Sequence, residues 1–178
     1  MRELKAWQYV SLDGVVRAPE NWVIPEVEMF AEQTAGYAAS DALLLGRRTY
    51  EVFAASWPGR GRDVANADWM NTTPKYVASA TLKAPEWQNT TVLEGDVGEA
   101  VSRLKQQDGQ DITLNGSAAL LRSLLAAGLV DELRLFLHPV VLGSGARLFD
   151  DTPLSVELAE CRAYDNGVAS LIYHPRKT

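Results

Sequence analysis

The chain has 178 residues, which suits one domain, and 47% of them are hydrophobic, enough for a core and too many for a disordered chain. Its formal net charge of -6 argues against general nucleic-acid binding, which depends on a basic surface. No apolar run approaches the roughly 20 residues that span a bilayer, and the N-terminal residues lack the apolar stretch of a signal peptide. The single cysteine, Cys161, excludes an internal disulfide, so we expect a cytoplasmic protein without membrane contact.

The N-terminal part of the chain predicts a strand, a loop, a helix and a second strand. The first strand is expected over Leu4–Leu12, which is rich in aromatic and β-branched residues, followed by a turn at Asp13-Gly14 and a loop to Pro25. A helix is expected over Glu26–Ala39, with an apolar face made of Val27, Phe30, Ala31, Thr34 and Ala38. The short apolar run Ala42–Leu45 predicts a strand buried on both faces.

The rest of the chain continues this alternation and then changes to strands alone. Helices are expected over Arg48–Ala55, Asp63–Met70, Asp96–Gln107 and from Ser117 to Gly128. Strands are expected over Lys75–Ser79, Thr90–Leu93, Ile112–Leu114, Glu132–Leu137, Ser155–Ala163 and Val168–Tyr173. This order predicts a single three-layer α/β domain over residues 1–178, with a mixed, mostly parallel sheet and antiparallel C-terminal strands.

Two segments share the order strand, glycine, helix. They are Asp41–Glu51, with its glycine at Gly46, and Asp111–Leu121, with its glycine at Gly116. At such a junction the N–H groups of the helix start face whatever lies beyond the strand end, and they bind anions, phosphate above all. Two junctions in one small domain predict a ligand with more than one phosphate, such as a dinucleotide. The alternative is a simple strand end for either glycine and a simple helix cap for Ser117.

Arginines favour the first junction as a phosphate site. Arg47 and Arg48 open its helix, where a cation is unfavourable against the helix dipole unless an anion binds there. A guanidinium group and the hydroxyl of Thr49 both hydrogen-bond phosphate. Arg60 and Arg62 are expected to join them in a local basic pocket.

Other chemistries have little support. The two histidines, His138 and His174, fall on predicted strands without metal-ligand spacing, and neither HExxH nor paired cysteines occur. We therefore expect no metal and a structural role for both histidines. The chain also lacks G-x-S-x-G, a P-loop and G-x-G-x-x-G, which argues against a serine hydrolase and an ordinary Rossmann site.

Six motifs follow one another along nearly the whole chain. They are Ser11–Gly14 (SLDG), Leu43–Glu51 (LLLGRRTYE), Lys75–Ser79 (KYVAS), Asn115–Ser117 (NGS), Gly128–Leu133 (GLVDEL) and Pro139–Phe149 (PVVLGSGARLF). In kind and order they resemble the dihydrofolate reductase-like superfamily, most of all the branch related to the C-terminal reductase domain of the riboflavin-biosynthesis deaminase/reductase. The resemblance implies a mixed-sheet α/β fold that binds NADPH in an extended form.

The resemblance also implies roles for particular residues. Cofactor phosphates would be contacted by Gly46, Arg47, Arg48 and Thr49, and the adenosine 2′-phosphate would lie near Ser79. The pyrophosphate and the nicotinamide ribose would meet Asn115, Gly116 and Ser117, where the family usually has paired glycines. The rim between substrate and nicotinamide would be formed by Ser11, Asp13 and Gly14.

Fewer residues point to the substrate. Glu26 precedes Phe30 by four residues, as the helix carboxylate of dihydrofolate reductase precedes a phenylalanine, so it is a candidate to bind a ring or to supply a proton through water. The alternative for Glu26 is an acid favoured by the helix dipole. Asp13 is the second catalytic candidate, with a structural Asp-Gly turn as its alternative. Trp22 lies in the loop expected over the substrate, where it stacks on a ring or only anchors the loop.

Taken with the resemblance, these features predict an NADPH-dependent reductase of a small C=N or C=O substrate, similar to 5-amino-6-(5-phosphoribosylamino)uracil reductase. The chain lacks the His-x-Glu and Pro-Cys-x-x-Cys zinc signature of the deaminase. The alternatives are a non-catalytic NADP-binding module and a true dihydrofolate reductase. A homodimer is also expected, through a surface of Leu133, Leu135 and Leu137.

Overall fold

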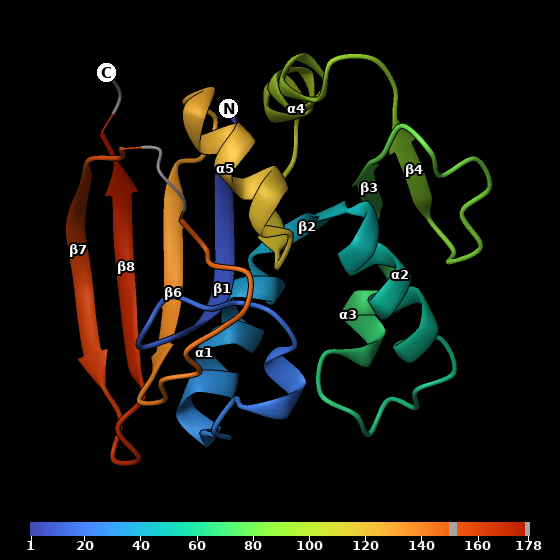
Figure 1. The fold of residues 1–178 in the computed structure, drawn as a ribbon. Coiled ribbons are helices and arrows are strands. Elements are labelled where there is room, and N and C mark those ends of the chain that lie inside the picture. Colours follow the sequence, from blue (N-terminus) through green and yellow to red (C-terminus); the bar gives the residue numbers. More distant parts are fainter. Residues whose placement is uncertain (150–152, 177–178) are drawn as a thin grey trace.

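The computed structural model of the chain describes residues 1–149 and 153–176 and shows helices on both sides of one sheet (Figure 1). The strands are β1 (Leu4–Ser11), β2 (Ser40–Gly46), β3 (Lys75–Ala78), β4 (Thr90–Leu93), β5 (Asp111–Asn115), β6 (Glu132–His138), β7 (Val156–Ala163) and β8 (Ala169–Pro175). The helices are α1 (Val27–Ala38), α2 (Arg47–Ser56), α3 (Ala67–Thr72), α4 (Val97–Gln106) and α5 (Ala118–Ala126), with a 3-10 turn at Pro19–Asn21. Among the described residues, no helix is both long and apolar enough to cross a membrane.

The sheet is mixed, as predicted. Its strand order is β4-β3-β2-β5-β1-β6-β8-β7. All neighbours from β4 to β6 pair in parallel, whereas β8 runs antiparallel to both β6 and β7. The predicted three-layer α/β fold with antiparallel C-terminal strands is therefore confirmed.

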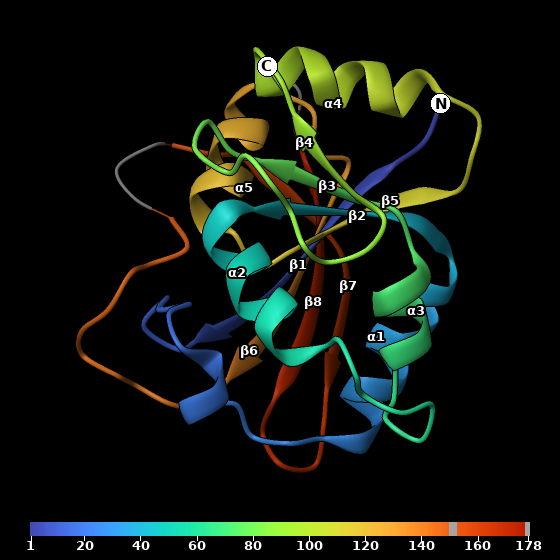
Figure 2. The same ribbon diagram turned by 90° about the vertical axis from the view of Figure 1, so that its right-hand side faces the viewer.

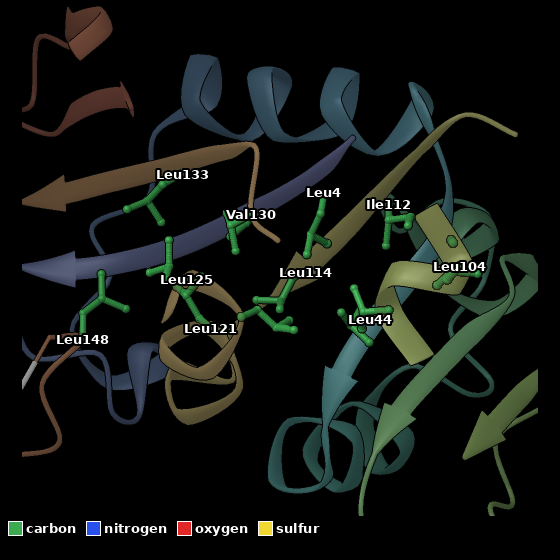
Figure 3. Packing of buried hydrophobic residues seen from close by; sticks show 14 of the residues in the cluster. Leu4, Leu44, Leu104, Ile112, Leu114, Leu121, Leu125, Val130, Leu133 and Leu148 are labelled. Atoms are coloured by element: carbon green, nitrogen blue, oxygen red, sulfur yellow. The ribbon is translucent and has the colours of Figure 1, made fainter. Parts of the chain in front are cut away.

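Strand β2 is buried on both faces, and its residues divide the core. Ala42 and Leu44 belong to the cluster between the sheet and the helices α4 and α5 (Figure 3). Leu43 and Leu45 belong to the cluster that α2 and α3 cover on the other face. Because successive side chains of a strand point to opposite faces, a run of four apolar residues is what a strand between two helix layers requires.

The apolar face predicted for the first helix is wrong. The buried side of α1 carries Met29, Gln33 and Tyr37, whereas Val27 is 81% exposed and Phe30 is 39% exposed. Gln33 is buried because its Oε1 accepts the hydroxyl of Tyr9 at 2.9 Å. A buried polar residue with a hydrogen-bond partner breaks the apolar pattern from which a helix face is predicted.

One of the three residues predicted to form a dimer surface lies in the core of the single chain, and the dimer itself stays a prediction. Strand β6 lies between β1 and β8, and its Leu133 is fully buried. Leu135 and Leu137 pack against the main core cluster. The exposed strand of this region is the sheet edge β7, on which Leu158 is 51% exposed.

A close contact between α1 and β1 gives a test of the packing. A Cβ atom at Gly36 would lie 2.1 Å from Cζ2 of the buried Trp7. Glycine to alanine in a helix normally stabilises by up to about 1 kcal/mol. Here we expect Gly36→Ala to lower the free energy of unfolding by about 1–3 kcal/mol, because the methyl group overpacks the core.

Urea unfolding of Gly36→Ala measures this effect, and the same substitution in a Trp7→Phe background is the control. The smaller ring should reduce the cost. Equal or higher stability of Gly36→Ala in the wild-type background would contradict the packing.

Candidate functional site

The two strand-glycine-helix junctions meet where the helices that follow neighbouring parallel strands cross to opposite faces of the sheet. Helix α2, which follows β2, packs on one face of the sheet through Tyr50. Helix α5, which follows β5, packs on the opposite face through Leu121. Since β2 and β5 are parallel neighbours, both helices start at the same edge of the sheet, the one formed by the carboxyl ends of the parallel strands (Figure 2). Open α/β sheets bind ligands in the crevice outside such a switch point.

Direct hydrogen bonds join the two junctions. The N–H of Gly46 donates to Ser117 Oγ at 2.8 Å, and the N–H of Ser117 donates to Thr49 Oγ1 at 3.1 Å. Gly116 has a left-handed backbone (φ +57), and a Cβ atom there would lie 3.2 Å from Thr49 Cγ2. The alternative of Ser117 as a simple helix cap is wrong, because its side chain caps nothing in α5 and bonds the other junction instead.

Helices α2 and α5 differ from the other helices at their starts. α1 and α4 are capped by the carboxylates of Glu26 and Asp96, and α3 carries Asp68 in its first turn. In the described part of the chain, α2 and α5 are the only α-helices with neither a side-chain cap nor an acidic residue in the first turn. Their first N–H groups and positive dipole ends are therefore left without a compensating negative charge, which suits an anionic ligand.

Only two of the four predicted arginines lie at this edge. Arg47 and Arg48 are exposed at the start of α2, where Arg47 forms an ion pair of 3.0 Å with Glu51 one turn later. Arg60 and Arg62 follow the opposite end of the helix, where Arg60 lies over an indole ring and Arg62 pairs with an aspartate. The prediction of one pocket with four arginines is wrong.

Ser79 follows β3, the next strand along the same edge. Its Oγ accepts the N–H groups of Thr81 and Leu82, at 3.2 and 2.9 Å, and so closes the turn after the strand. The oxygen keeps its own hydrogen for donation. Contact with a 2′-phosphate stays a prediction.

Asn115 and Gly116 are held by residues that the sequence did not single out. The Asn115 side-chain amide donates to the Tyr37 hydroxyl, on the α1 face of the sheet. Burial raises the pKa of Tyr37 well above its usual value, so the phenol stays neutral. The side chain of Gln8 donates to the Gly116 carbonyl and fixes this peptide. The sequence carried no signal for Tyr37 or Gln8, because both partners are distant along the chain.

The predicted rim residues form one hydrogen-bonded turn at the end of β1. Ser11 Oγ donates to Asp13 Oδ1 at 2.7 Å, and Gly14 adopts φ +84. The Asp13 carboxylate also accepts the N–H groups of Leu142 and Gly143, at 3.1 and 2.8 Å. These bonds, that of Ser11 first, lower the pKa of Asp13 to about 2. The ionised carboxylate ties the 139–147 segment to β1, and its catalytic role stays a prediction.

Glu26 lies at the N-terminus of α1, where its Oε1 accepts the N–H of Glu28 at 3.2 Å. This position agrees with the alternative for Glu26, an acidic residue that the dipole favours at a helix start. Phe30, which follows Glu26 by the four residues compared with dihydrofolate reductase, is on the exposed side of the helix. A catalytic role for Glu26 stays a prediction.

Trp22 lies beside His138. The Trp22 indole N–H donates to the Arg17 carbonyl at 2.8 Å, and the two rings meet edge to face, 5.7 Å apart between centroids. The buried Nδ1 of His138 accepts the N–H of Ile24 at 3.2 Å. Burial lowers the pKa of His138 to about 4, so the ring is neutral near pH 7. These contacts agree with the predicted structural role of His138 and with Trp22 as an anchor of its loop.

The surface has two hollows outside the predicted cofactor residues. One, of about 250 Å³, is lined by Trp7, Gly36 and Arg134, between α1 and the sheet. The other, of about 520 Å³, runs along α2 and is lined by Tyr50 and Trp87 among others. Neither includes a residue predicted to bind the cofactor, so the candidate site is defined by strand ends and helix starts.

Comparison with known proteins agrees with the fold class and the motifs. Residues 6–170 match the family model described as the RibD C-terminal domain, and the chain belongs to this family. It is 32% identical, over 178 residues, to the uncharacterized protein YyaP of Bacillus subtilis (strain 168), an alignment that covers 93% of this chain and 90% of YyaP. The resemblance to a branch of the dihydrofolate reductase-like superfamily is therefore confirmed.

Solved structures share the fold at low identity. A Shewanella sp. PV-4 protein, assigned provisionally to riboflavin biosynthesis, has a TM-score of 0.78 at 18% identity, over 98% of this chain and 99% of that one. A diaminohydroxyphosphoribosylaminopyrimidine deaminase/5-amino-6-(5-phosphoribosylamino)uracil reductase from Thermotoga maritima has a TM-score of 0.72 at 13% identity. The match covers 98% of this chain and 57% of that longer one.

The bonds of Asp13 predict that it fixes the segment after β6. Asp13→Asn leaves one side-chain acceptor in place of two, so we expect hydrogen exchange of the Leu142 and Gly143 amides to accelerate about fivefold to tenfold. Because the pKa of Asp13 is lowered from 3.8 to about 2, wild-type protection should be complete above about pH 4 and be lost as the pH falls through about 2.

Exchange followed by mass spectrometry or NMR measures this change. Asp108→Asn, the same change of charge at an exposed position, is the control and should leave both amides unaffected. Unchanged exchange in Asp13→Asn would show that the segment holds its place without the carboxylate.

Proposed function

We propose that this protein is an NADPH-dependent reductase. The observation that carries the proposal is the pair of uncapped, acid-free helix starts at the β2–β5 switch point. Two adjacent positive helix ends suit the two phosphates of a dinucleotide better than a single phosphate. Membership of the RibD C-terminal domain family supports the same cofactor.

Particular residues would hold the cofactor. Its phosphates would be bound by the first N–H groups of α2 and α5, by the hydroxyl of Thr49 and by the guanidinium group of Arg47. When bound, NADPH supplies a hydride. The protein positions the acceptor and keeps water from the reacting atoms.

The substrate class that fits best is a small molecule with a C=N or C=O group. The name of the Thermotoga maritima neighbour supports a phosphoribosylaminopyrimidine as the compound to test first. Oxidation of NADPH in its presence, followed by absorbance, supports the reductase. NADPH binding without oxidation of any pterin, pyrimidine or carbonyl compound supports a non-catalytic module instead.

Arg47 should contribute strongly to cofactor affinity. We expect Arg47→Ala to raise the dissociation constant of NADPH about tenfold or more, because a charge-assisted bond to phosphate is lost. Glu51→Gln should tighten binding by a few-fold, since it releases Arg47 from its ion pair. Fluorescence titration measures both constants.

Arg62→Ala, with the same charge change near the other end of α2, is the matched control and should bind NADPH as the wild type does. If Arg47→Ala and Arg62→Ala bind alike, phosphate recognition at the start of α2 is refuted.

We also propose a homodimer, through the exposed edge strand β7 rather than β6. An edge strand with unpaired backbone groups and an exposed Leu158 is suited to pairing with a second copy. Sedimentation at micromolar concentration should give twice the monomer mass, and Leu158→Lys should shift it toward the monomer. A monomeric wild type would refute the dimer.

A further inference from the structure

Ser117 connects the two helix starts and adopts a backbone conformation that is unusual for its residue type. Its φ is +56, in the left-handed region, directly after Gly116 at φ +57. A residue with a Cβ atom is uncommon there and is maintained by its surroundings. The surroundings of Ser117 are the bonds that it makes to the other junction.

Ser117 Oγ lies within hydrogen-bond distance of three polar atoms. Ser117 Oγ accepts the N–H of Gly46 and lies 2.8 Å from Thr49 Oγ1, closer than its 3.3 Å approach to the Asn115 carbonyl. A serine hydroxyl has one hydrogen to donate, and we assign it to the shorter contact, with Thr49 Oγ1 as the acceptor. Thr49 Oγ1 also accepts the N–H of Ser117 at 3.1 Å.

With Ser117 as the donor of this contact, Thr49 can only donate. Its oxygen already accepts two hydrogen bonds from Ser117, which occupies both lone pairs. Within residues 1–149 and 153–176, its own hydrogen has no acceptor. A hydroxyl that can only donate is suited to bind an anionic oxygen of a ligand. It cannot accept a hydrogen bond from a donor group of the ligand.

We propose that Ser117 is a positioning residue for the cofactor diphosphate: it holds Thr49 as a donor and joins the start of α2 to that of α5. Its hydroxyl acts through Thr49, instead of contacting phosphate as the sequence predicts. The N–H of Gly46 is likewise used inside the protein, so its expected phosphate contact falls to the amides that follow it. The inference rests on the proposed dinucleotide site.

Ser117→Gly tests this role, because glycine accepts the left-handed backbone while the hydroxyl is removed. We expect its melting temperature to stay the same or rise, while the dissociation constants of NADPH and NADH both increase about fivefold to tenfold. The ratio of the two constants should not change, because both dinucleotides carry the diphosphate. Ser123→Ala, at an exposed serine of α5, is the control and should change neither constant.

A double-mutant cycle separates positioning from a general loosening of the structure. Thr49→Val should weaken both dinucleotides at least as much as Ser117→Gly, and the double variant should bind no worse than Thr49→Val alone. If Ser117→Gly does not unfold cooperatively, Ser117→Ala replaces it with the same expected dissociation constants, although its melting temperature should fall because alanine keeps the strained backbone and loses the hydroxyl bonds.

Three outcomes would overturn the inference. Ser117→Gly could bind as the wild type, bind more tightly because the Gly46 amide is released, or add its full effect to that of Thr49→Val. In each case the wild type still binds, so the proposed function stands. A wild type that binds neither dinucleotide overturns the proposed function and this inference together.

Discussion

The parallel pairing of β2 with β5 is the constraint on which the candidate site depends. Their following helices leave toward opposite faces of the sheet, so both helix starts remain at one edge. Gly46 and Gly116 allow the two junctions to approach until their backbone and hydroxyl groups bond directly. Two positive dipole ends placed together repel each other, and an anion between them relieves this repulsion.

The protein treats its helix starts in two ways. The starts of α1 and α4 are stabilised by carboxylates of their own, from Glu26 and Asp96. The starts of α2 and α5 receive none, and arginines open α2 although the dipole disfavours them. Stability given up locally at such a place is typical of a binding surface, where the ligand supplies the missing charge.

Much of the fold could be predicted because its signals are local. The apolar run in β2 and the cap at Asp96 concern residues that are close in the chain. The buried face of α1 could not be predicted, because it includes the polar Gln33, which has a hydrogen-bond partner in the distant Tyr9. The four arginines looked like one group because they are near in sequence, yet α2 separates Arg47 from Arg62.

The sequence by itself determined the order of elements, the two glycine junctions and the motifs that define the family. Only the tertiary structure decided that Gly46 and Ser117, 71 residues apart, bond each other, and that the Asp13 carboxylate holds a segment 129 residues away. The physical reason is that helix starts and turns are set by neighbouring residues. The partner of a side-chain oxygen depends instead on which strands lie side by side, and no local pattern records that.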